Sequence, residues 1–275
     1  MLVTRAITAI VMIAALVLVL FLAPRVIWIF FCALFAARAA HEWGHLIGLS
    51  RNPGAAFMIG IALFVAVWPM LALPEICSQI IFAISAVFWM FLVPYWLWKL
   101  SLPLSRSFAI AVGTLVIVAA AIALIALRDG GAWLALCILG VIWVSDSAAY
   151  FVGSTLGRHK MAPGISPGKT WEGAAGAMAF VTLYALAWIY FSDGVLPGRF
   201  TDSLPGYLLL VAMMLLLAAL GIYGDLFESY LKRAAGVKDS GRILPGHGGI
   251  LDRIDALLPA LPVAALLFVQ QASGG

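Results

Sequence analysis

Apolar residues run along this chain in segments of about twenty, separated by short polar connections. These segments fall at 6–23, 26–47, 56–73, 76–97, 108–127, 132–153, 174–191, 207–228 and 250–269. A helix needs about 20 apolar residues to cross about 30 Å of hydrocarbon, whereas membrane-spanning strands would alternate in polarity over about ten residues. The pattern therefore predicts an all-α fold, a polytopic integral membrane bundle of about nine transmembrane helices.

Composition agrees with this interpretation, since 65% of the 275 residues are hydrophobic and only 10% are charged. A soluble globule of this size would need more polar surface. The apolar run after Arg5 is too long for the core of a typical signal peptide, so we treat it as the first span. We expect a single membrane domain over 1–275, with a helical scaffold in 1–130 and the polar chemistry in 131–275.

The distribution of basic residues predicts the orientation in the membrane. If nine spans alternate sides, Arg25, Arg128 and Arg199 share one side. The other side collects Arg5, Arg51, Lys99, Arg106, Arg158, Lys160, Lys169, Lys232, Arg233, Lys238, Arg242 and Arg253. The richer side is expected to be cytoplasmic, which places the N-terminus inside. We expect a bacterial inner-membrane protein whose site faces the cytoplasm.

Five acidic residues lie in the predicted cytoplasmic halves of apolar helices: Asp146, Asp225, Glu228, Asp252 and Asp255. Carboxylates at membrane depth are costly and usually face a cavity, an ion or a partner, although a salt bridge could explain any single one. Asp225, Glu228, Ser229 and Lys232 share one helix face, and Asp252 and Asp255 repeat the three-residue spacing. Oxygen ligands from two helices suit Mg²⁺ better than zinc.

Cationic and glycine-rich residues surround these acids. Lys232, Arg233, Lys238, Arg242 and Arg253 lie between or beside the two helices, and Pro245-Gly246-His247-Gly248-Gly249 precedes the last one. Glycine-rich turns before a helix let backbone amides approach an anion. Together with Mg²⁺-type carboxylates, this pattern favours a phosphate-bearing substrate and phosphoryl or nucleotidyl transfer.

A second polar loop contains Gly157-Arg158-His159-Lys160 and Ser166-Pro167-Gly168-Lys169-Thr170-Trp171-Glu172-Gly173. Gly168-Lys169-Thr170 resembles the end of a Walker A motif, but Pro163 stands where its first glycine belongs, so we reject that interpretation. Thr170 could simply cap a helix while the basic loop lies at an anionic membrane surface. The similar character of the two loops favours a shared phosphate site instead.

Two further functional classes compete with nucleotidyl transfer. His41-Glu42-Trp43-Gly44-His45 matches H-E-x-x-H, the zinc motif of metalloproteases, at the end of a hydrophobic span. A third zinc ligand is poorly provided for, because the Asp129-Gly130 dipeptide falls on the opposite side of the predicted membrane. A transporter would also use intramembrane acids, but it would need them through the full depth, and the far half is nearly bare.

A family resemblance rests on long, gapless stretches. Ser229-Tyr230-Leu231-Lys232-Arg233, Lys238-Asp239 and Pro245 to Asp255 resemble the signature of phosphatidate cytidylyltransferases, also called CDP-diacylglycerol synthases. Ser145-Asp146, Ala149-Tyr150-Phe151, Gly153, Gly157 and most of Ser166 to Gly173 are also similar to that family. The departure is Gly168, where the family usually has a second lysine. The resemblance covers about 143–255, and the first half is similar only in hydrophobic outline.

The resemblance implies that CTP and phosphatidic acid react to give CDP-diacylglycerol and pyrophosphate. Our hypothesis places one or two Mg²⁺ ions on Asp225 and Asp252, with Asp146 and Asp255 as further ligands, and makes Asp225, Lys232 and Asp252 catalytic. The expected substrate-binding residues are Ser166, Lys169, Thr170, Glu172, Ser229, Arg233, Lys238, Asp239, His247, Gly248, Gly249 and Arg253. The expected partners are CTP, phosphatidic acid and the lipid bilayer, with no nucleic acid. A homodimer is compatible with the resemblance.

Overall fold

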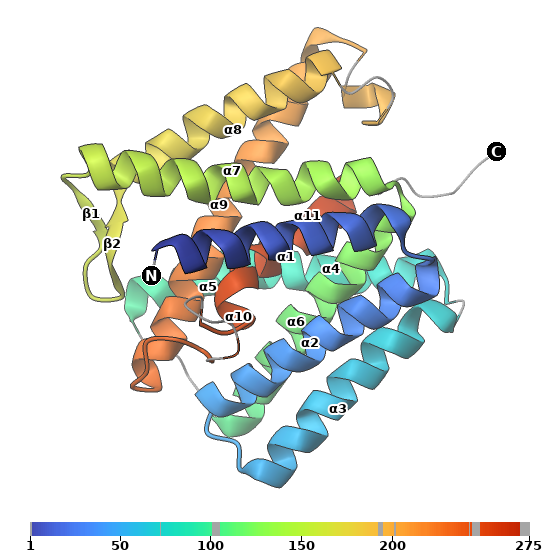
Figure 1. Ribbon diagram of the computed structural model, residues 1–275, viewed down its shortest axis with the longest axis vertical. Helices are drawn as coiled ribbons and strands as arrows, with labels where there is room; N and C mark the ends of the chain where they lie inside the picture. Colours follow the sequence, from blue (N-terminus) through green and yellow to red (C-terminus); the bar gives the residue numbers. More distant parts are fainter. Residues whose placement is uncertain are drawn as a thin grey trace.

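The computed structural model describes residues 2–71, 73–100, 105–191, 195–200, 202–241, 243 and 248–269, with side chains from residue 11 onward. The helices are α1 (Leu2–Leu22), α2 (Arg25–Leu46), α3 (Arg51–Val67), α4 (Glu75–Val87), α5 (Val93–Lys99), α6 (Arg106–Asp129), α7 (Ala132–Leu156), α8 (Trp171–Phe191), α9 (Leu204–Ala234), α10 (Leu251–Ile254) and α11 (Leu257–Phe268). They form one bundle, with α9 crossing it beside α7 and α8 (Figure 1).

The predicted apolar segments are largely helical where the structure describes them, although the last is divided into α10 and α11, and seven helical segments are long and apolar enough to cross a membrane. Val11–Leu22 and Leu257–Phe268 are shorter apolar helices. The structure thus confirms a mostly helical chain of the polytopic membrane type, while crossing by α1 and α11 stays a prediction.

The all-α expectation was incomplete, because the chain also contains a small β-hairpin. Strand β1 (Lys160–Ala162) pairs antiparallel with β2 (Ser166–Thr170), with Lys160 opposite Thr170 and Ala162 opposite Ser166. Pro163 and Gly164 fall between the two strands, where turn residues are expected. The hairpin connects α7 to α8.

An aromatic cluster packs beside the acidic residues of α9. The helix formed by α4 and α5 contains a π-helical turn, Phe88–Leu92, and its rings meet Phe227 of α9. Trp89 lies 5.4 Å from Phe227 between ring centroids, and Trp43 of α2 lies 6.3 Å away. The indole of Trp43 also donates to the carbonyl of Ala109 in α6 at 3.0 Å. These contacts fix the α9 segment that carries Asp225 and Glu228 against two other helices.

Helices α7 and α8 approach each other closely through glycines. A Cβ at Gly173 would lie 2.8 Å from the carbonyl oxygen of Ala149, so only glycine fits without a shift. Thr170 accepts a hydrogen bond from the Gly173 amide at 3.1 Å, as the cap of α8 that its sequence position suggested. The hairpin, the end of α9 and the loop before α10 lie at the same end of the bundle (Figure 1).

Candidate active site

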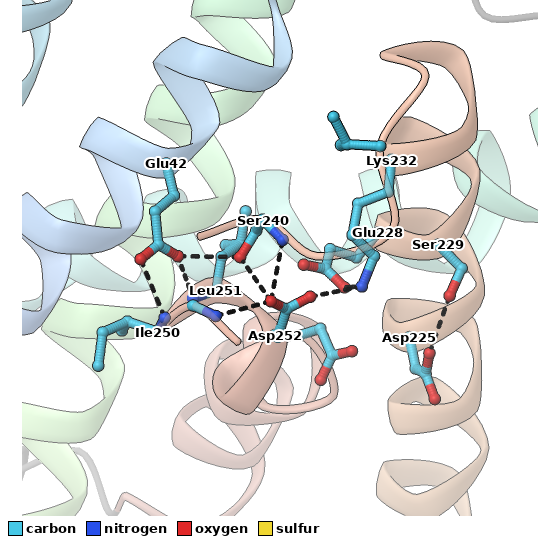
Figure 2. Close-up of polar contacts among 12 residues, drawn as sticks. Glu42, Asp225, Glu228, Ser229, Lys232, Ser240, Ile250, Leu251 and Asp252 are labelled. Atoms are coloured by element: carbon cyan, nitrogen blue, oxygen red, sulfur yellow. Dashed lines mark hydrogen bonds and ion pairs between the residues drawn. The ribbon is translucent and has the colours of Figure 1, made fainter. Parts of the chain in front are cut away.

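Lys232 is shared by two carboxylates at the centre of the site. Its Nζ lies 2.5 Å from Oε2 of Glu228 and 2.6 Å from Oδ1 of Asp252 (Figure 2). The side chain of Lys232 is 12% exposed, that of Glu228 is 2% exposed and that of Asp252 is 6% exposed. Glu228 is one helical turn before Lys232, whereas Asp252 comes from α10. One ammonium therefore joins α9 to α10 and neutralises charge that would be costly to bury alone.

Asp252 also organises the loop that precedes its own helix. Its Oδ2 accepts from the amides of Ser240 and Gly249 at 2.9 and 2.8 Å, and the Ser240 hydroxyl lies 3.0 Å away. Lys232 and these donors compensate the negative charge of the largely buried Asp252 carboxylate.

Gly248 lets the loop approach Asp252. It has a φ of +79°, which side chains rarely adopt, and an added Cβ would lie 2.6 Å from Oδ2 of Asp252. Gly248, which the sequence predicts to bind phosphate, therefore also has a structural reason to be glycine.

Lys169 brings the two predicted polar loops together. Its Nζ lies 2.7 Å from Oδ2 of Asp225 and donates to the carbonyl of Ile222 at 3.3 Å. The Ser229 hydroxyl donates to the other oxygen of Asp225 at 3.2 Å. The hairpin is thereby held against α9, as the hypothesis of a shared site requires.

Further carboxylates crowd this region. Asp146 is close enough to Asp225 for their charges to repel, and Asp255 is similarly affected by Asp225, Glu228 and Asp146. Lys169 and Arg253 oppose the charge of Asp146. Nevertheless, within the described ranges no three His, Cys, Asp or Glu side chains form a group that could hold a metal ion. The Mg²⁺ ligand set stays a prediction.

Glu172 and Thr170 have contacts that shape the hairpin. Glu172 accepts from the amides of Arg158 and His159 at 3.1 and 3.2 Å, and its Oε1 lies 2.6 Å from Nδ1 of His159. Thr170 is buried against Gly153 and Gly157 of α7 and its following loop. In this structure both residues tie the hairpin to its flanking helices.

Four further predicted substrate-binding residues lie at the end of α9, in the loop after it or in α10, and a fifth, Ser166, begins β2. Arg233 donates to the carbonyl of Val237 at 3.5 Å, and Lys238 and Asp239 are exposed in the loop after α9. Ser166 is half-buried at the start of β2, and Arg253 is exposed on α10. His247 lies outside the described residues. Binding by these residues stays a prediction.

Sequence reasoning missed two acidic contacts. Glu228 was recognised as a membrane-depth acid but not included among the metal or catalytic residues, although its four-residue spacing from Lys232 indicated a pair. Glu42 was assigned to a zinc motif. Instead it is buried beside α10, where it accepts hydrogen bonds from Ile250 and Leu251. Its position at the end of an apolar segment was the available signal.

Comparison of the sequence with known proteins agrees with the resemblance described above. The model of the cytidylyltransferase family matches residues 3–270. A protein of Haemophilus influenzae named phosphatidate cytidylyltransferase is 42% identical over 132 residues, which are 48% of this chain and 44% of that protein. Proteins of the same name from Staphylococcus aureus and Staphylococcus saprophyticus are 44% and 45% identical over 130 residues, covering 47% of this chain and 46% of each relative. The chain thus spans about half the length of the curated relatives it matches.

Proposed function

Because this chain belongs to the cytidylyltransferase family, we propose that it transfers the cytidylyl group of CTP to phosphatidic acid, forming CDP-diacylglycerol and pyrophosphate. The observation that carries the proposal is the contact between Lys169 and Asp225, which joins the cationic hairpin to the helix that carries the buried Glu228 and its partner Lys232. The names of the relatives support the choice of substrates. The reaction would supply activated lipid for phospholipid biosynthesis.

The chemistry needs positioning and charge neutralisation more than a protein nucleophile. A phosphate oxygen of phosphatidic acid attacks the α-phosphorus of CTP, and the bond from that phosphorus to the β-bridging oxygen breaks. The departing pyrophosphate takes the electron pair. The lipid phosphate is already anionic, so the protein must bring two polyanions together and stabilise the leaving charge.

Lys169 and Lys232 are suited to this task because an ammonium has three N–H donors. Lys169 contacts Asp225 and Ile222, and Lys232 contacts Glu228 and Asp252. Each ammonium therefore retains donor capacity for a phosphate oxygen beyond these pairs. Arg233, Lys238 and Arg253 would add positive charge nearby, while Ser166, Ser229, Asp239 and the Gly249 amide would help to orient the substrates.

The donor chemistry around Asp225 fits Mg²⁺, which prefers oxygen ligands. Asp255 lies within electrostatic range of Asp225, Glu228 and Asp146, and Oε1 of Glu228 is buried without a hydrogen-bond partner among the described residues. We propose that Asp225, Asp146 and Asp255, which do not form a ready-made metal group in the substrate-free structure, hold the ion together with phosphate oxygens of CTP. Asp252, whose oxygens already accept from Lys232, Ser240 and Gly249, would position the loop. The ion would neutralise charge on the triphosphate and leaving pyrophosphate.

The proposed location follows from the substrates and the basic residues. Phosphatidic acid presents its phosphate at the membrane surface, and CTP would arrive from the cytoplasm. The end of the bundle that carries the hairpin and the loop after α9 would therefore face the cytoplasm. A homodimer remains a prediction that the family resemblance allows.

A direct assay tests the proposed function. The protein, purified in detergent, should release pyrophosphate only when CTP, phosphatidic acid and Mg²⁺ are all present. Asp225→Asn keeps the side-chain shape and should lower kcat by roughly 100-fold, because the charge that positions cations is lost. Asp129→Asn is the matched control, since Asp129 pairs with Arg25 far from the site. Turnover without phosphatidic acid, or unchanged turnover in Asp225→Asn, would contradict the proposal.

The structure does not favour the zinc-protease alternative. Both oxygens of Glu42 accept hydrogen bonds from the loop around α10, so its carboxylate is not directed to a water on a metal held by His41 and His45. The imidazole rings of these histidines lie edge to face, with centroids 4.7 Å apart. Membership of the cytidylyltransferase family also argues against a protease.

A further inference from the structure

We propose that Glu42 is a positioning residue of the active site, which holds the loop before α10 in its working arrangement. This inference rests on the proposed cytidylyl transfer. It concerns a carboxylate in the first half of the chain, outside the motifs of residues 143–255 and outside the set of groups that would touch substrate. Its side chain is 2% exposed.

The carboxylate of Glu42 is fully engaged by the end of the chain. Oε1 accepts from the amide of Ile250 at 3.1 Å, and Oε2 accepts from the amide of Leu251 at 2.8 Å (Figure 2). These amides stand at the start of α10, where backbone N–H groups have no partner within the helix. Glu42 therefore fixes the point at which α10 begins. Leu251, the first residue of α10, follows Glu42 by 209 positions in the sequence.

Ser240 connects Glu42 to Asp252. Its hydroxyl lies 2.9 Å from Oε2 of Glu42 and 3.0 Å from Oδ2 of Asp252. A hydroxyl has one proton, so it donates to one of the two at a time while holding both in place. Asp252 in turn holds Lys232. A displacement of Glu42 would thus be passed through Ser240 and Asp252 to the ammonium proposed to bind phosphate.

Gly241 and Gly249 are packed too closely against Glu42 to take another position without loss of contacts. A Cβ at Gly241 would lie 2.7 Å from Oε1, and one at Gly249 would collide with Oε2. The chain therefore passes the Glu42 carboxylate twice, at Gly241 and at Gly249. On the other side Arg38, one turn earlier in α2, lies 3.4 Å from Oε1.

Glu42→Gln is the main test, because it keeps the shape but removes one acceptor oxygen. The glutamine NH₂ group would face an N–H group or the Ser240 hydroxyl, and at least one backbone hydrogen bond would be lost. We expect kcat to fall roughly 10- to 100-fold and the KM for CTP to rise, because Lys232 is displaced. A smaller folded fraction would lower the apparent kcat without changing KM. Glu42→Asp, which keeps the charge, should recover part of the activity.

Hydrogen exchange of the substrate-free protein provides a readout that does not depend on activity. In Glu42→Gln the amides of Ile250 and Leu251 should exchange faster, while amides in α6 should not change. His45→Ala is the matched control on the same helix, and it should keep wild-type kinetics and exchange because His45 is exposed. Ser240→Ala covers the case in which Glu42→Gln does not fold, and it should lower kcat and raise the KM for CTP.

The outcomes separate the two proposals. If the wild-type protein turns over and Glu42→Gln has unchanged kinetics and exchange, the positioning role is wrong. If Glu42→Gln does not fold and Ser240→Ala has wild-type kinetics, the role is also wrong. If the wild-type protein releases no pyrophosphate from CTP and phosphatidic acid while Glu42→Gln still accelerates exchange at Ile250 and Leu251, the proposed function fails and the contact itself stands.

Discussion

Single residues in this site are governed by how several carboxylates share a few cations. Lys232 contacts Glu228 and Asp252 at once, and Lys169 contacts Asp225. Removing one member of a buried ion pair leaves an uncompensated charge, which is more damaging than replacing the whole pair. The residues of the site therefore cannot be substituted independently of one another.

Lys232→Met should lower the melting temperature of the detergent-solubilised protein. Glu228 and Asp252 would lose their shared cation while still repelling each other, at a cost of about 3 kcal/mol. The double variant Glu228→Gln with Lys232→Met should recover part of the loss, because less charge remains unpaired. Equal melting temperatures for Lys232→Met and the wild-type protein would refute this account.

Gly168→Lys should be tolerated and should lower the KM for CTP about threefold. Nothing lies within 4 Å of a Cβ at Gly168, so the new side chain has room. The added ammonium would extend from β2, the strand that carries Lys169, and attract the triphosphate. Steady-state kinetics at fixed salt measure the effect, with Gly168→Gln as the uncharged control. A KM no lower than that of Gly168→Gln would show that no phosphate passes nearby.

The sequence predicted that the Lys169 loop and the acids of α9 share one site, because these polar segments fall on the same predicted side of the membrane, but it did not predict that Lys169 pairs with Asp225. It could not predict the partner of Glu42. Helical spacing relates residues a few positions apart, whereas Ile250 and Leu251 follow Glu42 by 208 and 209 positions. The local H-E-x-x-H pattern then suggested a different chemistry.

At the scale of elements, long apolar runs were sufficient to locate the helices, because a span must satisfy its backbone within the helix. The hairpin escaped prediction since its strands contain only three and five residues and show no clear alternation of polarity. The π-helical turn Phe88–Leu92 also has no sequence signature at this level, although it lies where the aromatic cluster meets Phe227.

The contact between α7 and α8 makes a further prediction. Gly173→Ala should lower the melting temperature by several degrees, because its Cβ would press on the carbonyl of Ala149 and push the helices apart. Gly168→Ala, where the surroundings are open, is the matched control and should melt as the wild-type protein does. Thermal unfolding followed by circular dichroism measures both. If the two variants melt at the same temperature, the packing of α7 against α8 does not require glycine at position 173.

At the scale of the whole molecule, the predicted division into a scaffold and a catalytic half is crossed by a direct contact. Glu42 of α2 holds the loop that leads to Asp252, so the first half contributes to the site's geometry. The division into residues 1–130 and 131–275 stays a prediction. It describes where the substrates would bind, whereas residues from both parts shape the site.

The orientation of the bundle can be tested by cysteine labelling. In a background whose three cysteines are replaced, Lys238→Cys should react with an impermeant maleimide only after the cells are opened. Glu75→Cys, which is exposed on the other predicted side between the segments 56–73 and 76–97, should react in cells whose outer membrane is permeabilised but whose inner membrane is intact. The positive-inside rule gives this expectation. The reverse labelling pattern would invert the topology.

The long separation between Glu42 and its partners also sets an order of events during synthesis. Chains grow at about 5–20 residues per second, so Glu42 is made roughly 10–40 s before Leu251. During that interval its carboxylate lacks the amides that finally satisfy it, and a buried unpaired acid is costly. The last helices therefore complete the packing of the second one. A chain released before α10 is made would leave Glu42 without these partners, which gives cellular quality control a defect to recognise.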